Sequence, residues 1–125
     1  MPGILISNEK SYYTKTGAFR NIIEDVISVE ADGSGEFLQV QLDKLEGFLL
    51  DVRLQFATGA EKPDNVDIAI YDSHNVDILA GKGAGFTDNA MIQVAPPIAV
   101  HAPLSVAISG NTVANAKLLV IIHAF

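Results

Sequence analysis

Short runs of alternating apolar and polar residues recur along most of the chain, separated by residues that form turns. Alternation with a period of two is typical of a strand that buries one face. The clearest run is 48–56, in which we expect Asp51, Arg53 and Gln55 to face solvent. The expected inward-facing set of this run is Phe48, Leu50, Val52, Leu54 and Phe56.

Many short strands at a spacing of about ten residues are typical of antiparallel sandwiches and jelly rolls. Turn-forming residues such as Asp32-Gly33 separate the runs, and Pro96-Pro97 is expected to break the chain between two short runs, 91–94 and 97–100. We therefore predict an all-β fold, an antiparallel β-sandwich or jelly-roll-like, with an extended N-terminal arm. The expected strands are 25–31, 37–42, 48–56, 66–71 and 76–79 (these two as a hairpin), 91–94, 97–100, 104–109 and 117–125.

The end of the chain, residues 102–125, is the most apolar part of this pattern. Residues 104–109 alternate, residues 110–116 are rich in Gly, Asn and Thr, and residues 117–125 are apolar on both faces. We expect the two runs to form a hairpin whose last strand is covered on both sides. We expect the core to cover one face of residues 117–125 and a second subunit to cover the other. The second subunit then contacts either the odd-numbered or the even-numbered positions of this strand. The predicted self-association residues are Leu119, Ile121 and Phe125, with Leu118, Val120 and Ile122 as the alternative.

The first 21 residues show no sustained period of two or 3.6. We interpret residues 1–21 as an N-terminal arm and residues 22–125 as a single β-sandwich domain. The arm is either a frayed terminus or a segment that becomes ordered on a neighbouring subunit. The predicted partner-binding residues are Ile4, Leu5, Ile6, Tyr12 and Tyr13.

Charge is distributed unevenly along the chain. The net charge is −7, all fifteen acidic residues lie at or before Asp88, and Lys117 is the only formally charged residue in 89–125. A long stretch with one charge predicts burial in the core, against another subunit, or both. The acidic balance argues against nucleic-acid binding and against anionic membrane surfaces. We expect no signal peptide, and no apolar run in the sequence is long enough to span a membrane, so we expect the protein to stay in the cell that makes it.

No classical catalytic or cofactor motif is present, and we predict no enzyme activity, cofactor or metal site. The glycine-rich run 81–85 has neither the spacing of a P-loop nor that of a dinucleotide fingerprint, and we expect a mobile loop. The chain has no cysteine, and no G-x-S-x-G elbow surrounds Ser105 or Ser109. The three histidines, His74, His101 and His123, have no ligand spacing.

Two weaker binding hypotheses remain. Four aspartates around residues 64–77 could offer oxygens to calcium, but they lack EF-hand spacing, and a solvated acidic rim is the favoured interpretation. Tyr12, Tyr13 and Tyr71 could form a stacking platform for a sugar, as in a carbohydrate-binding sandwich. The four aspartates are Asp64, Asp67, Asp72 and Asp77.

Two segments together carry a family resemblance. Residues 66–85 (VDIAIYDSHNVDILAGKGAG) run into a glycine-rich loop, and residues 103–122 (PLSVAISGNTVANAKLLVII) join two apolar strands through a Ser-Gly-Asn and Ala/Asn-rich turn. This pattern resembles small all-β virion proteins of tailed bacteriophages. The resemblance covers residues 35–125, and the N-terminal residues have no matching part.

The resemblance implies a non-enzymatic structural protein of a phage particle. A capsid decoration (cement) protein that stabilises the head by bridging subunits is the first expectation, and a tail or head-fibre component is the alternative. Such proteins commonly form trimers, so the expected partners are further copies of this chain and the major capsid protein or another virion protein. The expected location is the virion, after synthesis in the host cytoplasm.

Overall fold

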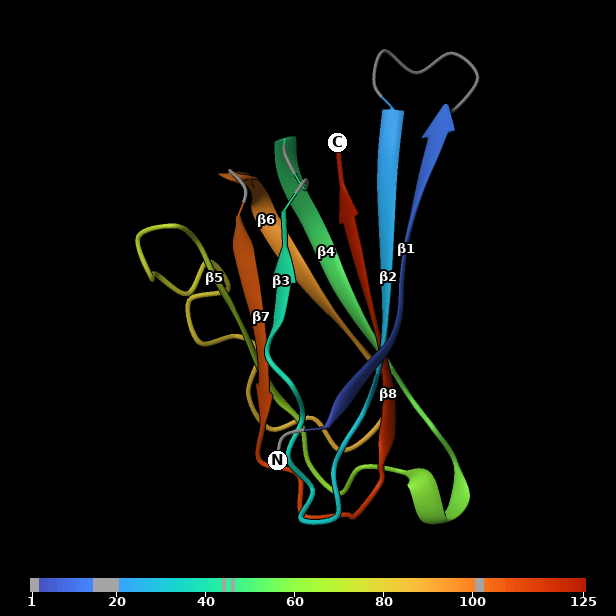
Figure 1. Cartoon of the computed structure of the whole chain (residues 1–125). Coiled ribbons are helices and arrows are strands. Elements are labelled where there is room, and N and C mark those ends of the chain that lie inside the picture. The colour runs from blue at the N-terminus through green and yellow to red at the C-terminus, as the bar shows by residue number, and fades with distance from the viewer. Residues whose placement is uncertain (1–2, 15–20, 44, 46, 101–102) are drawn as a thin grey trace.

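The computed structural model describes residues 3–14, 21–43, 45, 47–100 and 103–125. Its strands form two antiparallel sheets that pack face to face (Figure 1). The strand order is β1-β2-β8-β4-β6 in the larger sheet and β3-β7-β5 in the smaller one. The predicted all-β class and antiparallel sandwich are confirmed. The strands are β1 (Ile4–Thr14), β2 (Asn21–Glu30), β3 (Val40–Leu42), β4 (Gly47–Phe56), β5 (Asp67–Tyr71), β6 (Ala90–Val100), β7 (Leu104–Ser109) and β8 (Lys117–Ala124), with a short 3-10 helix η1 (Gly59–Glu61) after β4.

The hydrophobic core lies between the two sheets. β8 is the central strand of the five-stranded sheet, and its residues Leu118, Val120 and Ile122 are fully or almost fully buried. Ile70 of β5 and Val106 of β7 are buried on the inner face of the smaller sheet. Burial of such a side chain contributes about 1.5–3 kcal/mol to stability. The even-numbered face of β8 therefore belongs to the core.

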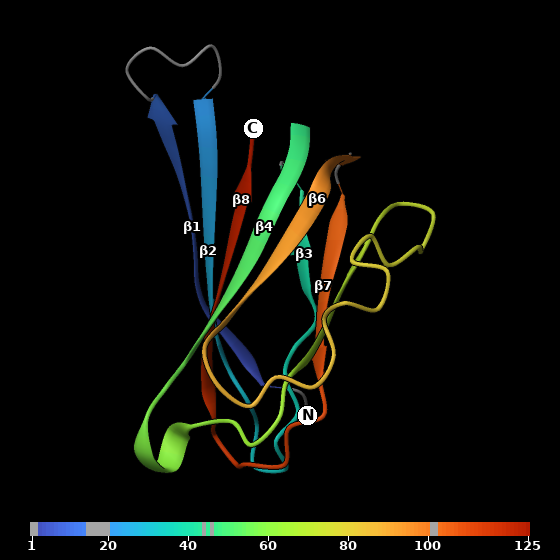
Figure 2. The same cartoon turned by 180° about the vertical axis from the view of Figure 1, so that it is seen from behind.

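β7 and β8 do not form the hairpin that the sequence predicts. β7 pairs with β3 and β5, whereas β8 pairs with β2 and β4 in the other sheet. Residues 110–116 therefore cross from one sheet to the other, as Figure 2 shows at the lower end of the molecule. A hairpin and a crossover both join two alternating runs through Gly- and Asn-rich residues, so the local pattern does not distinguish them.

The predicted N-terminal arm is largely a strand of the sandwich. Residues Ile4–Thr14 form β1, which pairs with β2 along its whole described length and rises with it as a hairpin (Figure 1). A register shift between Leu5 and Ser7 interrupts the alternation. β1 is also an edge strand, and the part of it that extends past the smaller sheet has no opposing sheet to cover an apolar face. The register shift and this position together explain why the sequence of β1 does not alternate with a period of two. The predicted boundary at residue 21 thus falls within a hairpin.

β4 changes its inward-facing set at a β-bulge. The register shifts between Leu49 and Asp51 against both neighbouring strands. Leu49 is buried and Phe48 is exposed, so the inward orientation predicted for Phe48 is wrong, and Leu50 at the bulge is only partly buried. A bulge adds one residue to one strand and thereby exchanges the faces on its two sides. The other predicted inward residues are buried: Val52, Leu54 and Phe56.

Residues 76–79 do not form the predicted strand. Tyr71 and Asp77 make only an isolated bridge. Asp77 Oδ1 accepts hydrogen bonds from the backbone N–H groups of Ile70 (3.2 Å) and Leu79 (3.0 Å). The carboxylate thus takes the place of a strand partner and holds this segment as a turn beside β5.

Two further strands differ in extent from their predictions. β3 covers only Val40–Leu42 of the predicted 37–42. The predicted runs 91–94 and 97–100 lie in one strand, β6, but its pairing with β4 is interrupted between Gln93 and Ile98. Proline has no backbone N–H to donate, so the Pro96-Pro97 pair falls in the unpaired part of this edge strand.

Candidate functional site

The outer face of the five-stranded sheet is the candidate site. Because the even-numbered residues of β8 enter the core, its odd-numbered residues point away from the smaller sheet. Leu119, Ile121 and Phe125, the predicted self-association residues, all lie on this face and are partly exposed. Of the two sets of residues that the sequence left open, the odd-numbered set therefore points outward and the even-numbered set points into the core. Self-association itself stays a prediction.

Neighbouring strands extend these positions into an apolar surface. Val26 of β2 lies opposite Ile121, and Met91 of β6 lies opposite Arg53 on the same face. Phe48 and Phe125 exchange two backbone hydrogen bonds, and their rings stack with centroids 5.7 Å apart. Met91 and Phe48 are 53% and 44% exposed, and apolar side chains that gather on one face mark interaction sites. We call this set the outer-face patch: Val26, Phe48, Met91, Leu119, Ile121 and Phe125.

The patch is hollowed on both sides of Gln55. A depression of about 230 Å³ lies between Ser28, Gln55 and Leu119. A second depression of about 490 Å³ is lined by Arg53, Gln55, Met91 and Ile121. Such relief offers space for side chains of a facing surface.

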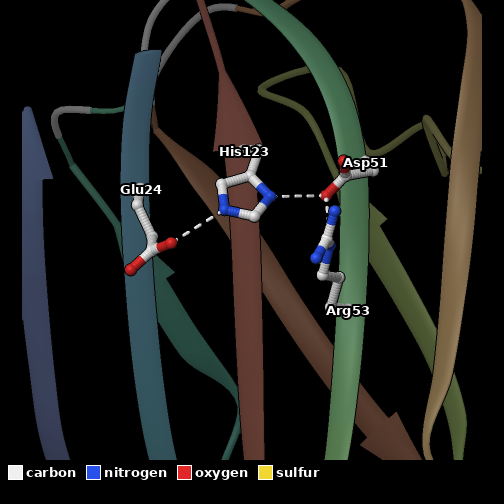
Figure 3. A network of polar contacts seen from close by, with 4 residues as sticks. All are labelled: Glu24, Asp51, Arg53 and His123. Carbon is white, nitrogen blue, oxygen red and sulfur yellow. Dashed lines mark hydrogen bonds and ion pairs between the residues drawn. The ribbon is translucent and has the colours of Figure 1, made fainter. Parts of the chain in front are cut away.

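A polar network crosses three strands of the same face (Figure 3). His123 Nδ1 lies 2.7 Å from Asp51 Oδ1 of β4, and His123 Nε2 lies 2.9 Å from Glu24 Oε2 of β2. Arg53 Nε lies 3.5 Å from the same Asp51 oxygen. The side chain of His123 is 15% exposed, so these contacts are largely shielded from water. The network fixes the relative positions of β2, β8 and β4 beside the patch.

The environment of His123 favours its charged form. Partial burial alone would lower the pKa of His123, but the hydrogen bonds and negative charges of Glu24 and Asp51 outweigh it and raise the pKa above its ordinary value. A protonated imidazole donates from both nitrogens and so satisfies both carboxylates. The sequence offered one signal for this network, a polar residue at an outward position of an otherwise apolar strand. Its partners could not be inferred because they depend on strand register.

β1 is a second candidate contact region. It forms one edge of the larger sheet, and the predicted partner-binding residues Ile4, Leu5 and Ile6 are exposed on it. Tyr12 and Tyr13 are residues of β1, and the structure describes their backbone but not their side chains. A long exposed edge strand is a template for pairing with another chain.

The other sheet edges are better protected than β1. Ile68 of β5 donates its backbone N–H to the Gly83 carbonyl at 2.7 Å, and Val66 and Phe86 make a bridge beside it. β6 carries the Pro96-Pro97 pair, and β3 is short. Among the strands that the structure describes, β1 is therefore the long edge that is most open to strand addition.

The aspartates weighed as calcium ligands organise loops. Asp64 accepts hydrogen bonds from the backbone and hydroxyl groups of Thr112, and these bonds hold its pKa below the ordinary value. Asp67 accepts from the Gly85 N–H at 2.7 Å. Asp72 accepts from the N–H groups of residues 74 and 76, and Asp77 caps the turn described above. Within the described ranges, no three His, Cys, Asp or Glu side chains gather to hold a metal ion.

The remaining candidate residues that the structure describes do not gather at one place. His74 is exposed in a loop, and His101 lies outside the described residues. Ser105 and Ser109 lie on β7 and pair with Tyr71 and Asp67 at opposite ends of β5. In the part of the chain that the structure covers, no helix has the length and apolar character required to cross a membrane.

Comparison with known proteins gives no match to a family model, to a curated protein or to a solved structure.

Proposed function

We propose that this chain is a non-enzymatic structural subunit that assembles with copies of itself through the outer face of the five-stranded sheet. The observation that carries the proposal is the outward row of the central strand β8, on which Leu119 and Ile121 lie, continued by Phe125 directly after the strand. Apolar side chains in such a position lose water-exposed surface when a second subunit covers them, which stabilises the assembly by about 25 cal/mol per Å².

The dimensions of the face support this role. Five strands spaced about 4.8 Å apart, with eight to eleven residues at about 3.3 Å each, span roughly 600–900 Å². An interface of standard size takes about 800 Å² from each partner. The outer face is thus large enough for one stable contact.

The second part of the proposal concerns the phage particle on which the subunit assembles. Following the resemblance to tailed-phage virion proteins, the oligomer, a trimer by that resemblance, decorates a phage capsid as a cement protein. In this assignment β1, with Ile4, Leu5 and Ile6, contacts the major capsid protein or another virion protein, and the outer-face patch contacts further copies. Exposed acidic loop residues such as Asp64 and Asp88 then face solvent.

The test of self-association uses two matched charge substitutions. Ile121→Lys places a charge in the outer-face patch, and Val76→Lys places one at an exposed apolar residue of a loop. We expect the wild-type chain and Val76→Lys to form the same oligomer in sedimentation velocity, and Ile121→Lys to be monomeric with unchanged far-ultraviolet circular dichroism. A wild-type monomer at all concentrations, or an Ile121→Lys oligomer like the wild type, would overturn the proposal.

The virion part has its own test. We expect the chain to co-purify with phage particles in the cells that produce it, and to be found on heads by antibody labelling. Labelling on tails or fibres would favour the alternative assignment. An oligomer absent from every particle would contradict the virion assignment and leave the assembly role standing.

A further inference from the structure

Asp25 is a buried carboxylate at the edge of the core. It lies on the inner face of β2, two residues before the buried Ile27, and its side chain is 0% exposed. Neither of its carboxylate oxygens has a hydrogen-bond partner among the described residues. A charged group removed from water without hydrogen bonds is costly, so this position needs an explanation.

Lys10 of β1 compensates the buried charge of Asp25 only in part. Its Nζ lies 3.8 Å from Asp25 Oδ2, which is an ion pair but too long for a hydrogen bond. The Lys10 side chain is itself 22% exposed. Burial raises the pKa of Asp25, and the positive charge of Lys10 offsets that rise only in part. A carboxylate offers about four acceptor positions, and an ammonium group at this distance fills none of them well.

Asp25 is one of the residues that line a hollow where β1, β2 and β3 meet. The hollow has a volume of about 200 Å³, and oxygen-bearing side chains of three segments line it. Asp43, directly after β3, accepts a hydrogen bond of 2.9 Å from the Gln41 amide. The lining residues are Asn8, Lys10, Asp25, Gln41, Leu42 and Asp43.

We propose that this hollow binds a hard divalent cation, with calcium preferred over magnesium. Two carboxylates (Asp25 and Asp43) supply the charge, and the amide oxygens of Asn8 and Gln41 supply neutral ligands. Calcium accepts six to eight oxygens in irregular geometry, whereas magnesium requires an octahedron and retains its waters. A mixture of carboxylate and amide oxygens from three segments therefore suits calcium better than magnesium. Lys10 turns outward when the cation binds, because its ammonium group competes for the same carboxylate.

The site is independent of the proposed assembly role, because Asp25 faces inward whereas the outer-face patch faces away from the core. Cation binding would tie the β1–β2 hairpin to β3 and so stabilise the folded state by mass action. We expect a dissociation constant of about 0.1–1 mM for calcium, as in weak extracellular-type sites.

The experiment titrates the full chain with calcium chloride and with magnesium chloride, by calorimetry and by thermal unfolding. Asp25→Asn should weaken calcium binding at least about tenfold, since a directly ligating charge is lost. Asp43→Asn should weaken it as well, and it serves as the second variant if Asp25→Asn does not fold. Lys10→Met should strengthen binding several-fold, because the competing charge is gone. Glu36→Gln, an exposed acidic residue outside this hollow, should change nothing.

Absence of calcium binding at millimolar concentration would overturn the site. Equal binding by the wild-type chain, Asp25→Asn and Asp43→Asn would also overturn it, because calcium would then be bound elsewhere. Sedimentation of the same samples separates this outcome from a failure of the assembly proposal.

Discussion

The imidazole of His123 and the carboxylate of Asp51 meet at 2.7 Å although 72 residues separate them in the sequence. β8 places His123 between β2 and β4, and the bulge after Leu49 directs Asp51 onto the outer face. Glu24 completes the bridge from the other side. A charged cluster is therefore embedded beside the apolar residues of the outer-face patch.

This bridge predicts that stability declines as the pH rises above neutrality. The pKa of His123 is raised in the folded state, so the protonated imidazole stabilises the fold fully below the unfolded-state pKa of about 6.5. That contribution is lost as the pH rises through the folded-state pKa. A neutral imidazole has one N–H, so one of the two carboxylates then loses its donor. Urea unfolding at a series of pH values from about 5.5 to 9 measures the slope.

The control for this prediction is the exposed His74. His123→Gln should remove most of the pH dependence in this window, whereas His74→Gln should retain it. Parallel curves for the wild-type chain and His123→Gln would show that the bridge makes no net contribution.

Asn111 predicts a second, local contribution to stability. Its side chain is buried in the crossover between β7 and β8, and it bonds three separate segments. Nδ2 donates to the carbonyl oxygens of Gly35 and Val113 at 3.0 Å, and Oδ1 accepts from the N–H groups of Asp64 (3.2 Å) and Val113 (3.1 Å). Asn111→Ala should lower the free energy of unfolding by about 1–3 kcal/mol, because buried backbone groups lose their partners.

The exposed Asn115 in the same crossover is the matched control. Its φ is 57°, a left-handed conformation that glycine adopts without strain, so Asn115→Gly removes the side chain and keeps the backbone conformation. This substitution should change the free energy of unfolding by less than about 0.5 kcal/mol in the same urea titration. Equal effects of the two substitutions would mean that the side-chain bonds of Asn111 do not hold the crossover.

The alternating pattern of the sequence was informative about the core and about the outer face. Alternation correctly placed Val52, Leu54 and Phe56 in the core, because a half-buried strand has a period of two. It also identified Leu119 and Ile121 as members of one face. The fold class follows from such local patterns, since the alternation within each strand indicates which of its faces is buried.

Features that depend on register were not predictable from the pattern. The bulge in β4 reversed the orientation expected for Phe48, and nothing in the local composition marks it. The crossover of residues 110–116 has the composition of a hairpin turn. Glu24, Asp51 and His123 converge only after three strands are aligned. In each case a tertiary contact selects among alternatives that are locally equivalent.

The glycine-rich run 81–85 gives the last prediction. The sequence suggested a mobile loop, but Gly83 accepts the β5 hydrogen bond from Ile68, and a Cβ built on Gly83 would lie 1.9 Å from the Ile68 carbonyl oxygen. Gly83→Ala should therefore displace the loop from the edge of β5 and lower the free energy of unfolding by about 1–3 kcal/mol, as overpacked sites do.

Gly33 provides the comparison for Gly83. Neither glycine has a positive φ, and a Cβ built on Gly33 meets no heavy atom of the described residues within 4 Å. Gly33→Ala should thus leave the urea midpoint unchanged or raise it slightly, because alanine reduces the entropy of the unfolded chain. Amide hydrogen exchange of Ile68 completes the measurement, since its N–H should lose protection in Gly83→Ala alone. Undiminished protection of Ile68 in Gly83→Ala would mean that the loop accommodates the methyl group and that the β5 edge is closed by other contacts.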